Sequence, residues 1–184
     1  MEVVNRADIC EYPVAMLGES AKAQFEKLLQ QHAGIIRKIA IGYARTESDR
    51  RDLMQEIAVQ LWRAYPRYSA KRPFSTWMYR IALNVAISFL RKNTRPGRVT
   101  VPFDESVHDV AHEHSGPSEM QERIEMLQQL IANCRPLDRA LLLLYLDDCS
   151  YREIAAVLGL TETNVATKLG RLKEQLRQKL TTKG

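Results

Sequence analysis

The sequence predicts an all-α protein made of two small helical domains joined by a flexible linker, the second domain containing a helix-turn-helix. Two observations predict this class. Apolar residues recur every three or four positions in several long segments, which is the period of one helix face. Between Asn93 and Ser118 that period stops and three prolines and two glycines appear, which is typical of a linker. Strand-like residues are limited to Arg98–Phe103.

We therefore divide the chain into a leader (1–19), a first helical domain (20–95), an acidic linker (96–118) and a second helical domain (119–184). The first domain is expected to hold three helices. One spans Ser20–Tyr43; a second starts at Ser48 or Asp49 and ends near Pro66; a third follows Pro73, capped by Ser75 or Thr76. The expected inward faces are Leu53, Ile57, Leu61 and Trp62 on the second helix, and Trp77, Ile81, Val85 and Phe89 on the third.

The second domain is expected to begin with a helix from Ser118 to about Cys134, followed by a strongly apolar helix that Pro136 opens, Leu137–Leu146. A further helix, Tyr151–Leu158, meets Gly159, which can adopt the positive φ of a tight turn. Thr161 then caps the next helix. Two helices joined in this way, with the small Ala155 at their crossing, make a helix-turn-helix.

The chain has a net charge of +5, and its charged residues are distributed unevenly along the sequence. Residues 57–103 contain nine Lys and Arg and no acidic residue, whereas residues 104–122 contain six acidic residues and no Lys or Arg. Residues 123–184 return to a net charge of +3. A polyanion such as DNA would be attracted to both domains and repelled by the linker, because phosphate neutralisation releases counterions.

Several classes of function are not indicated. The chain shows no Gly-rich phosphate loop, no helical H-E-x-x-H and no nucleophile elbow, so we do not expect an enzyme or a cofactor. The three cysteines form no C-x-x-C pair, and His108, His112 and His114 lack a fourth ligand, so no metal site is predicted. No apolar run is long enough for membrane insertion and no signal peptide is evident, so a cytoplasmic protein is expected.

Three strings together resemble the extracytoplasmic-function (ECF) group of RNA polymerase sigma factors, in the sigma-70 family. DLMQEIAVQLWRAYPRY (52–68) and FSTWMYRIALNVAISFLRK (74–92) resemble the family's second conserved region. SYREIAAVLGLTETNV (150–165) resembles its fourth. The resemblance covers most of the chain, and the order of the strings is far more specific than a helix-turn-helix alone. It implies a sigma factor that binds core RNA polymerase and directs promoter recognition, DNA melting and transcription initiation.

The resemblance also implies partners. The helix at 49–62 would bind the clamp helices of the beta-prime subunit, and further contacts would involve the beta subunit. An anti-sigma factor is expected as a partner that holds the protein inactive. The acidic linker would either thread toward the polymerase active centre or act as a tether. The implied polymerase-binding residues are Asp49, Asp52, Leu53, Gln55 and Glu56.

Promoter DNA is the other implied partner. Cationic side chains suit the phosphates of the minus-ten element, and the family places a base pocket at the start of the helix at 74–92. The implied minus-ten residues are Lys71, Arg72, Phe74, Ser75, Tyr79, Arg80, Asn84, Ser88, Arg91 and Lys92. Trp77 lies in the same segment, and we expect it in the core. Many relatives carry an acid at the position of Ser88 and a basic residue at that of Ala166, which leaves the promoter sequence open.

Outward polar residues at the start of the second helix of the helix-turn-helix suit base edges in the major groove, and cations further along suit phosphates. By resemblance these contacts would fall on the minus-35 element. The implied residues are Arg152, Thr161, Glu162, Thr163, Asn164, Thr167, Lys168 and Arg171.

Two other functions fit parts of this pattern. A transcriptional regulator with a helical sensor domain would bind duplex DNA alone, whereas a sigma factor would bind it weakly without polymerase. An adaptor that binds polymerase without reading promoters would not need the basic residues of 62–98 or of the recognition helix.

Overall fold

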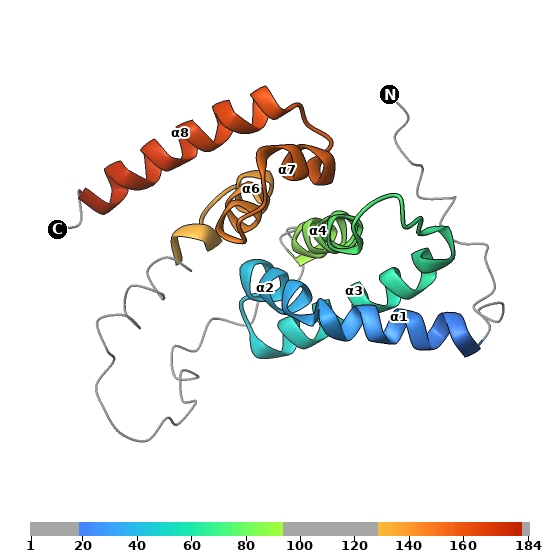
Figure 1. The fold of residues 1–184 in the computed structure, drawn as a ribbon. Coiled ribbons are helices and arrows are strands. Elements are labelled where there is room, and N and C mark those ends of the chain that lie inside the picture. The colour runs from blue at the N-terminus through green and yellow to red at the C-terminus, as the bar shows by residue number, and fades with distance from the viewer. Residues whose placement is uncertain (1–18, 94–128, 182–184) are drawn as a thin grey trace, which may run out of the picture.

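The computed structural model of the protein describes residues 19–93 and 129–181. Every regular element in these two ranges is a helix, which confirms the all-α class (Figure 1). None of the helices within them is both long and apolar enough to cross a membrane. The first range contains α1 (Glu19–Gln31), α2 (Ala33–Tyr43), α3 (Glu47–Ala64), the 3-10 turn η3 (Tyr65–Arg67) and α4 (Phe74–Asn93); the second contains α6 (Pro136–Leu146), α7 (Tyr151–Leu158) and α8 (Glu162–Thr181).

The prediction of one helix over Ser20–Tyr43 is wrong, because the chain breaks at His32 and continues as α2. The break lets the two halves bury different faces. Phe25 on α1 packs against the rings of Trp62 and Tyr65, at centroid distances of 5.1 Å and 4.9 Å. The α2 helix instead buries Ile35, Ile36 and Ile39 with Tyr43. An unbroken apolar stripe does not reveal such a change of packing partner.

The start of α3 differs slightly from the expected one. Thr46 is the N-cap, and its Oγ1 accepts a hydrogen bond from the backbone N–H of Asp49 at 3.0 Å. The helix therefore begins at Glu47 rather than at Ser48 or Asp49. Leu53, Ile57 and Leu61 are fully buried as predicted, while Trp62 is only half-buried.

The buried face of α4 differs from the predicted one, which lies beside it on the helix surface. Trp77, Ile81, Val85 and Phe89 are half-buried. The helix begins at Phe74, where the carbonyl of Pro73 accepts the N–H of Trp77, without the predicted Ser75 or Thr76 cap. Apolar residues cover a wide arc of α4 because it packs against α2, α3 and α7, so periodicity alone could not identify the buried side. The fully buried residues are Phe74, Met78, Tyr79, Ala82, Leu83 and Ala86.

The helix-turn-helix is present as predicted. Gly159 ends α7 with φ +68°, in the left-handed region that glycine adopts without strain. Thr161 caps α8, since its Oγ1 accepts the N–H of Asn164 at 3.2 Å. Ile154, Val165 and Leu169 are fully buried between the helices, and α6 supplies further core leucines.

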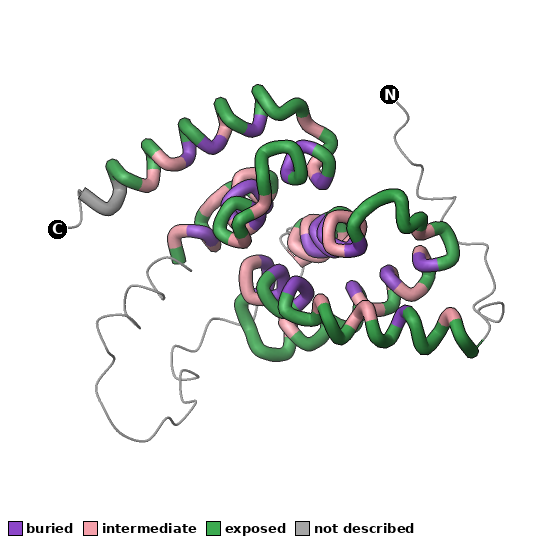
Figure 2. Tube along the Cα trace, viewed as in Figure 1, coloured by how far each residue is buried: buried purple, intermediate pink, exposed green. Residues whose placement is uncertain are grey.

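The two helical units are in contact, although the linker led us to expect separate bodies. The α2 helix packs against α6, and α4 packs against α7. In Figure 2 the buried residues gather where the helices face one another, while the outer turns of α1, α3 and α8 are exposed. The leader, the acidic linker with its three histidines, the strand-like segment 98–103 and most of the predicted helix 118–134 lie outside the residues that the structure describes.

Candidate nucleic-acid and polymerase interfaces

The outer side of α3 carries four exposed residues that share one face at i, i+3, i+4 and i+7 spacing. They are Asp52, Gln55, Glu56 and Val59, and we call them the α3 face. The carboxylate of Glu56 accepts a hydrogen bond from Nε2 of Gln60 at 2.9 Å. A strip of exposed polar side chains that continues into an exposed apolar one is suited to binding a protein partner.

Two residues of the predicted polymerase-binding set lie elsewhere. Leu53 is completely buried, so it supports α3 from the core side and is not available to a partner. Asp49 is half-buried and takes part in the helix cap, since Oγ1 of Thr46 also donates to its carboxylate at 2.8 Å. Val59, which the sequence analysis missed, is 44% exposed at the C-terminal end of the α3 face. Its exposure could have been inferred only from the position of the core on the opposite side of α3.

A second surface follows α4. Arg80, Asn84 and Ser88 are exposed at four-residue spacing along one side of the helix, and Arg91 and Lys92 are exposed in its last turn. We call these five residues the α4 face. Lys71 and Arg72 are exposed in the loop before the helix. Residues 57–93 contain no acidic side chain, so neither α4 nor the loop before it supplies a carboxylate that would offset these charges.

Two predicted minus-ten residues are buried in the structure. Phe74 and Tyr79 are each only 6% exposed, and Ser75 is half-buried. The Phe74 ring packs against Tyr68 at a centroid distance of 5.4 Å, as part of an aromatic cluster. The hydroxyl of Tyr79 is buried with no hydrogen-bond partner among the described residues. Neither side chain offers a surface to DNA in this conformation.

Tyr68 positions the basic loop, a role that the sequence analysis missed. Its hydroxyl donates to the carbonyl of Arg72 at 3.0 Å, and its ring packs against Trp77 at 5.1 Å. Trp77 was expected in the core, and it is half-buried and packs against the core. The aromatic cluster thereby holds Lys71 and Arg72 at the start of the α4 face.

The third surface is the start of α8. Glu162, Thr163, Asn164, Thr167 and Arg171 are exposed there. Thr161, before the helix, and Arg152, on α7, are also exposed, while Lys168 is half-buried. Oγ1 of Thr167 donates to the carbonyl of Thr163 at 2.9 Å, so its proton is already used within the helix. The amide and carboxylate side chains of Asn164 and Glu162 are the exposed groups best suited to reading base edges.

A complete capping box anchors α7, the first helix of this motif. Ser150 Oγ accepts the backbone N–H of Glu153 at 3.2 Å, and the Glu153 carboxylate accepts the backbone N–H of Ser150 at 2.8 Å. The hydrogen bonds from the Ser150 hydroxyl and backbone hold the pKa of Glu153 below its ordinary value. This contribution to stability is therefore present at neutral pH and is lost only as the pH falls through that lowered pKa.

Cys149, just before the box, is half-buried, and burial is the main cause that raises the pKa of its thiol to about 11. The thiol is therefore protonated and unreactive near neutral pH.

Both helical units match models of known protein families. Residues 28–96 match the family model of sigma-70 region 2, and residues 124–176 match that of sigma-70 region 4. These two stretches contain the α3 face, the α4 face and the start of α8.

Three relatives are informative. The ECF RNA polymerase sigma factor SigE of Mycolicibacterium smegmatis is 26% identical over 166 residues, which are 88% of this chain and 63% of that protein, or less than two thirds of its length. The RNA polymerase sigma factor CnrH of Cupriavidus metallidurans is 25% identical over 94% of this chain and 95% of its own. The sigma factor RpoE of Bartonella quintana, solved with the anti-sigma factor NepR, has the same fold, with a TM-score of 0.67 over 86% of this chain and 97% of its own at 19% identity. The chain therefore belongs to the sigma-70 family, as a transcription-initiation factor of the ECF group.

Proposed function

We propose that this sigma factor binds core RNA polymerase through the α3 face, opens and reads the minus-ten element with the α4 face, and reads the minus-35 element with the start of α8. The observation that carries the proposal is the separation of three exposed surfaces of different chemistry. The α3 face contains two carboxylates, the α4 face contains three cations, and the start of α8 presents side chains suited to base edges. A protein that must hold an enzyme and two DNA elements requires three such surfaces.

The α4 face has the chemistry needed to hold a separated DNA strand. Opening a duplex without ATP requires compensation for lost stacking, which phosphate contacts and captured bases provide. Arg80 and Arg91 can neutralise phosphates at the two ends of the face. Asn84, between them, carries an amide that can donate to and accept from a base edge. Lys71 and Arg72 extend the cationic path into the loop.

The helix-turn-helix supports duplex reading at the second element. In such motifs the N-terminal residues of the recognition helix contact base edges in the major groove. Glu162 and Asn164 occupy these positions on α8, and Arg171 lies two turns further along, where it can reach a phosphate. The beta subunit of the polymerase is the expected neighbour of this unit.

An anti-sigma factor is part of the proposal. The fold shared with Bartonella quintana RpoE, which was solved with the anti-sigma factor NepR, supports a partner of this class. Such a partner would restrain the protein by covering the surfaces that polymerase needs. We place this restraint in the cytoplasm, where the polymerase is found.

The direct test is transcription from genomic fragments by purified bacterial core polymerase, with and without this protein. We expect specific start sites only when the protein is added. The control is the protein alone on the same fragments, where a sigma factor should bind duplex DNA weakly. Tight duplex binding with no effect on initiation would instead indicate a conventional regulator.

Asn84→Ala separates promoter opening from assembly. The substitution removes an exposed amide from the α4 face and leaves the core of α4 intact. We expect promoter opening, followed by permanganate reactivity of unpaired thymines, to fall roughly tenfold, because a lost base contact is worth about 1–3 kcal/mol. Binding to core polymerase should remain unchanged. Loss of both activities together would contradict the assignment of the two faces to different tasks.

A further inference from the structure

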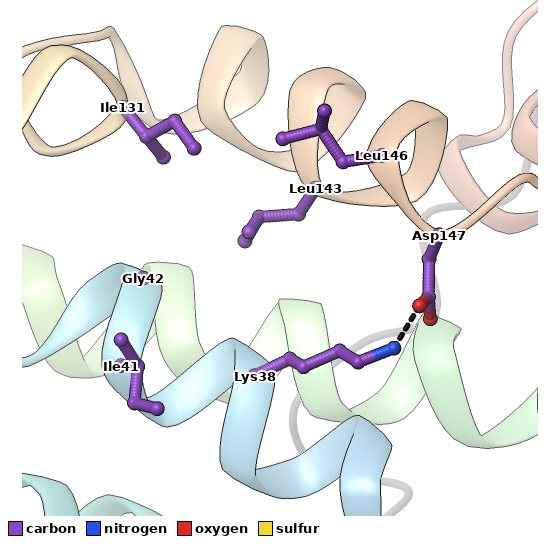
Figure 3. Close-up of a pocket in the computed structure, with 7 residues that line it drawn as sticks. All are labelled: Lys38, Ile41, Gly42, Ile131, Leu143, Leu146 and Asp147. Carbon is purple, nitrogen blue, oxygen red and sulfur yellow. Dashed lines mark hydrogen bonds and ion pairs between the residues drawn. The ribbon is translucent and has the colours of Figure 1, made fainter. Parts of the chain in front are cut away.

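Cations at the contact between the two helical units are already paired within the protein. Lys38 of α2 forms an ion pair with Asp147, beside a hollow of about 240 Å³ between α2 and α6 (Figure 3). Nη1 of Arg139 donates to the carbonyl of Gly42 at 2.9 Å. Because these cations have partners inside the molecule, they are not suited to binding a phosphate.

The loop between η3 and α4 has the opposite character. Residues 69–73 are all exposed, and they include Lys71 and Arg72 in a stretch of the chain without acidic residues. None of these five side chains is held by the core. An exposed loop of this kind would ordinarily take many conformations, and a ligand that bound it would have to order it at a cost in affinity. Hydrogen bonds within the loop remove much of this freedom.

Residues 69–72 form a type I turn. The backbone N–H of Arg72 donates to the carbonyl of Ser69 at 3.2 Å, and the N–H of Lys71 donates to Oγ of Ser69 at 3.4 Å. The positive φ values of the described residues lie elsewhere in the chain, so the two central residues, Ala70 and Lys71, have negative φ. A turn closed by this bond with negative φ at both central positions is of type I.

Tyr68 adds a bond from outside the turn. Its hydroxyl donates to the carbonyl of Arg72 at 3.0 Å, which connects the two ends of the loop. The Tyr68 ring is itself held by Phe74 and Trp77 of α4, at centroid distances of 5.4 Å and 5.1 Å. The carbonyl of Pro73 accepts the N–H of Trp77 at 3.2 Å. The loop is therefore fixed to the same helix that carries the α4 face.

We propose that Tyr68 is a positioning residue for capture of the separated minus-ten strand. It holds Lys71 and Arg72 in the conformation that binds the phosphates of the strand, so the strand does not have to order the loop when it binds. This role rests on the proposed function of the α4 face. Tyr68 acts through the carbonyl of Arg72 and is not required to touch the DNA.

Tyr68→Phe removes the hydroxyl and keeps the ring that packs against Phe74 and Trp77. The complex of this protein with bacterial core RNA polymerase is titrated onto labelled single-stranded DNA from the opened region of a promoter that the protein activates. Fluorescence anisotropy measures the affinity. We expect a loss of about fivefold, the effect of one hydrogen bond of ordinary net strength. Binding to core polymerase itself should not change, because Tyr68 lies outside the α3 face.

Tyr65→Phe is the matched control. The Tyr65 ring stacks on that of Tyr68 at a centroid distance of 6.0 Å, but its hydroxyl takes part in none of the three loop bonds. This variant should bind the strand as the parent does. An equal loss in both variants would show a general effect on the aromatic cluster and would contradict the positioning role of Tyr68.

Ala70→Pro supplies the lost restraint by another route. Proline fixes φ at about −65°, which suits the second position of a type I turn, and Ala70 is exposed. Added to Tyr68→Phe, it should return the strand affinity to within about twofold of the parent, because it limits the loop before binding. A hydroxyl that contacted DNA directly could not be replaced in this way. A double variant as weak as Tyr68→Phe would therefore overturn the proposal.

Amide hydrogen exchange in the protein without polymerase, followed by NMR, tests the loop separately from the DNA. The N–H of Arg72, which is bonded to Ser69, should exchange several-fold faster in Tyr68→Phe and at the parent rate in Tyr65→Phe. An unchanged rate in Tyr68→Phe would also overturn the proposal. If the parent complex failed to bind the strand, the proposed function would fail, while the exchange rates would still report whether the hydroxyl orders the loop.

Discussion

Leu53→Ala should destabilise the protein by about 3 kcal/mol, the cost of removing a fully buried leucine and leaving a cavity. Leu53 is 0% exposed and belongs to the stripe with Ile57 and Leu61 that packs α3 onto the first helical unit. Chemical denaturation followed by circular dichroism measures the change. For a domain of ordinary stability this is a large part of the total.

The neighbouring Met54→Ala is the matched control. Met54 is 36% exposed on the same helix, so its truncation should change the free energy of unfolding by no more than about 0.5 kcal/mol. Comparing the two variants shows whether Leu53 stabilises the core or binds polymerase. If Leu53→Ala left stability unchanged and reduced only polymerase binding, the buried position of Leu53 would be wrong and its place in the polymerase-binding set would be restored.

Glu56→Arg should weaken binding to core polymerase at least tenfold while leaving the fold intact. Glu56 is exposed on the α3 face, and among the described residues its carboxylate is bonded to the side chain of Gln60 within the same helix. Reversing its charge replaces attraction to a cationic partner by repulsion, which commonly costs more than 1.4 kcal/mol at an interface. Fluorescence anisotropy with labelled protein measures the affinity.

Glu26→Arg provides the comparison for that experiment. It makes the same change in net charge at an exposed site on a different helix, α1. An equal loss of affinity in both variants would show a general effect of net charge and would contradict a specific α3 interface. The contribution of Val59, the exposed apolar side chain at the end of the same face, can be tested on the same scale.

Elements with a strong local signal were predicted correctly. The helix-turn-helix depends on Gly159, which adopts φ +68°, and on Thr161, which caps α8 as expected. Both effects act within a few residues, so a sequence reveals them without knowledge of the rest of the fold. The exposed spacing of Arg80, Asn84 and Ser88 was likewise predictable from helical geometry.

Predictions that depended on distant packing were less successful. The break at His32 and the buried side of α4 follow from which helices surround them, and apolar residues on several sides of α4 make more than one core face consistent with its sequence. Phe74 and Tyr79 were assigned to the base pocket by resemblance, yet an aromatic cluster and the helical core bury them. The assignments of the remaining site residues stay predictions.

The sequence by itself determined the helical class, the helix-turn-helix and the family, because helical period, turn residues and ordered motifs are local properties of the chain. Only the tertiary structure decided which side of α4 is buried, that Val59 is exposed, and that α2 and α6 touch through Arg139 and Gly42. Those contacts join residues about one hundred positions apart. Burial energy and close packing select them collectively, so no single segment carries the information.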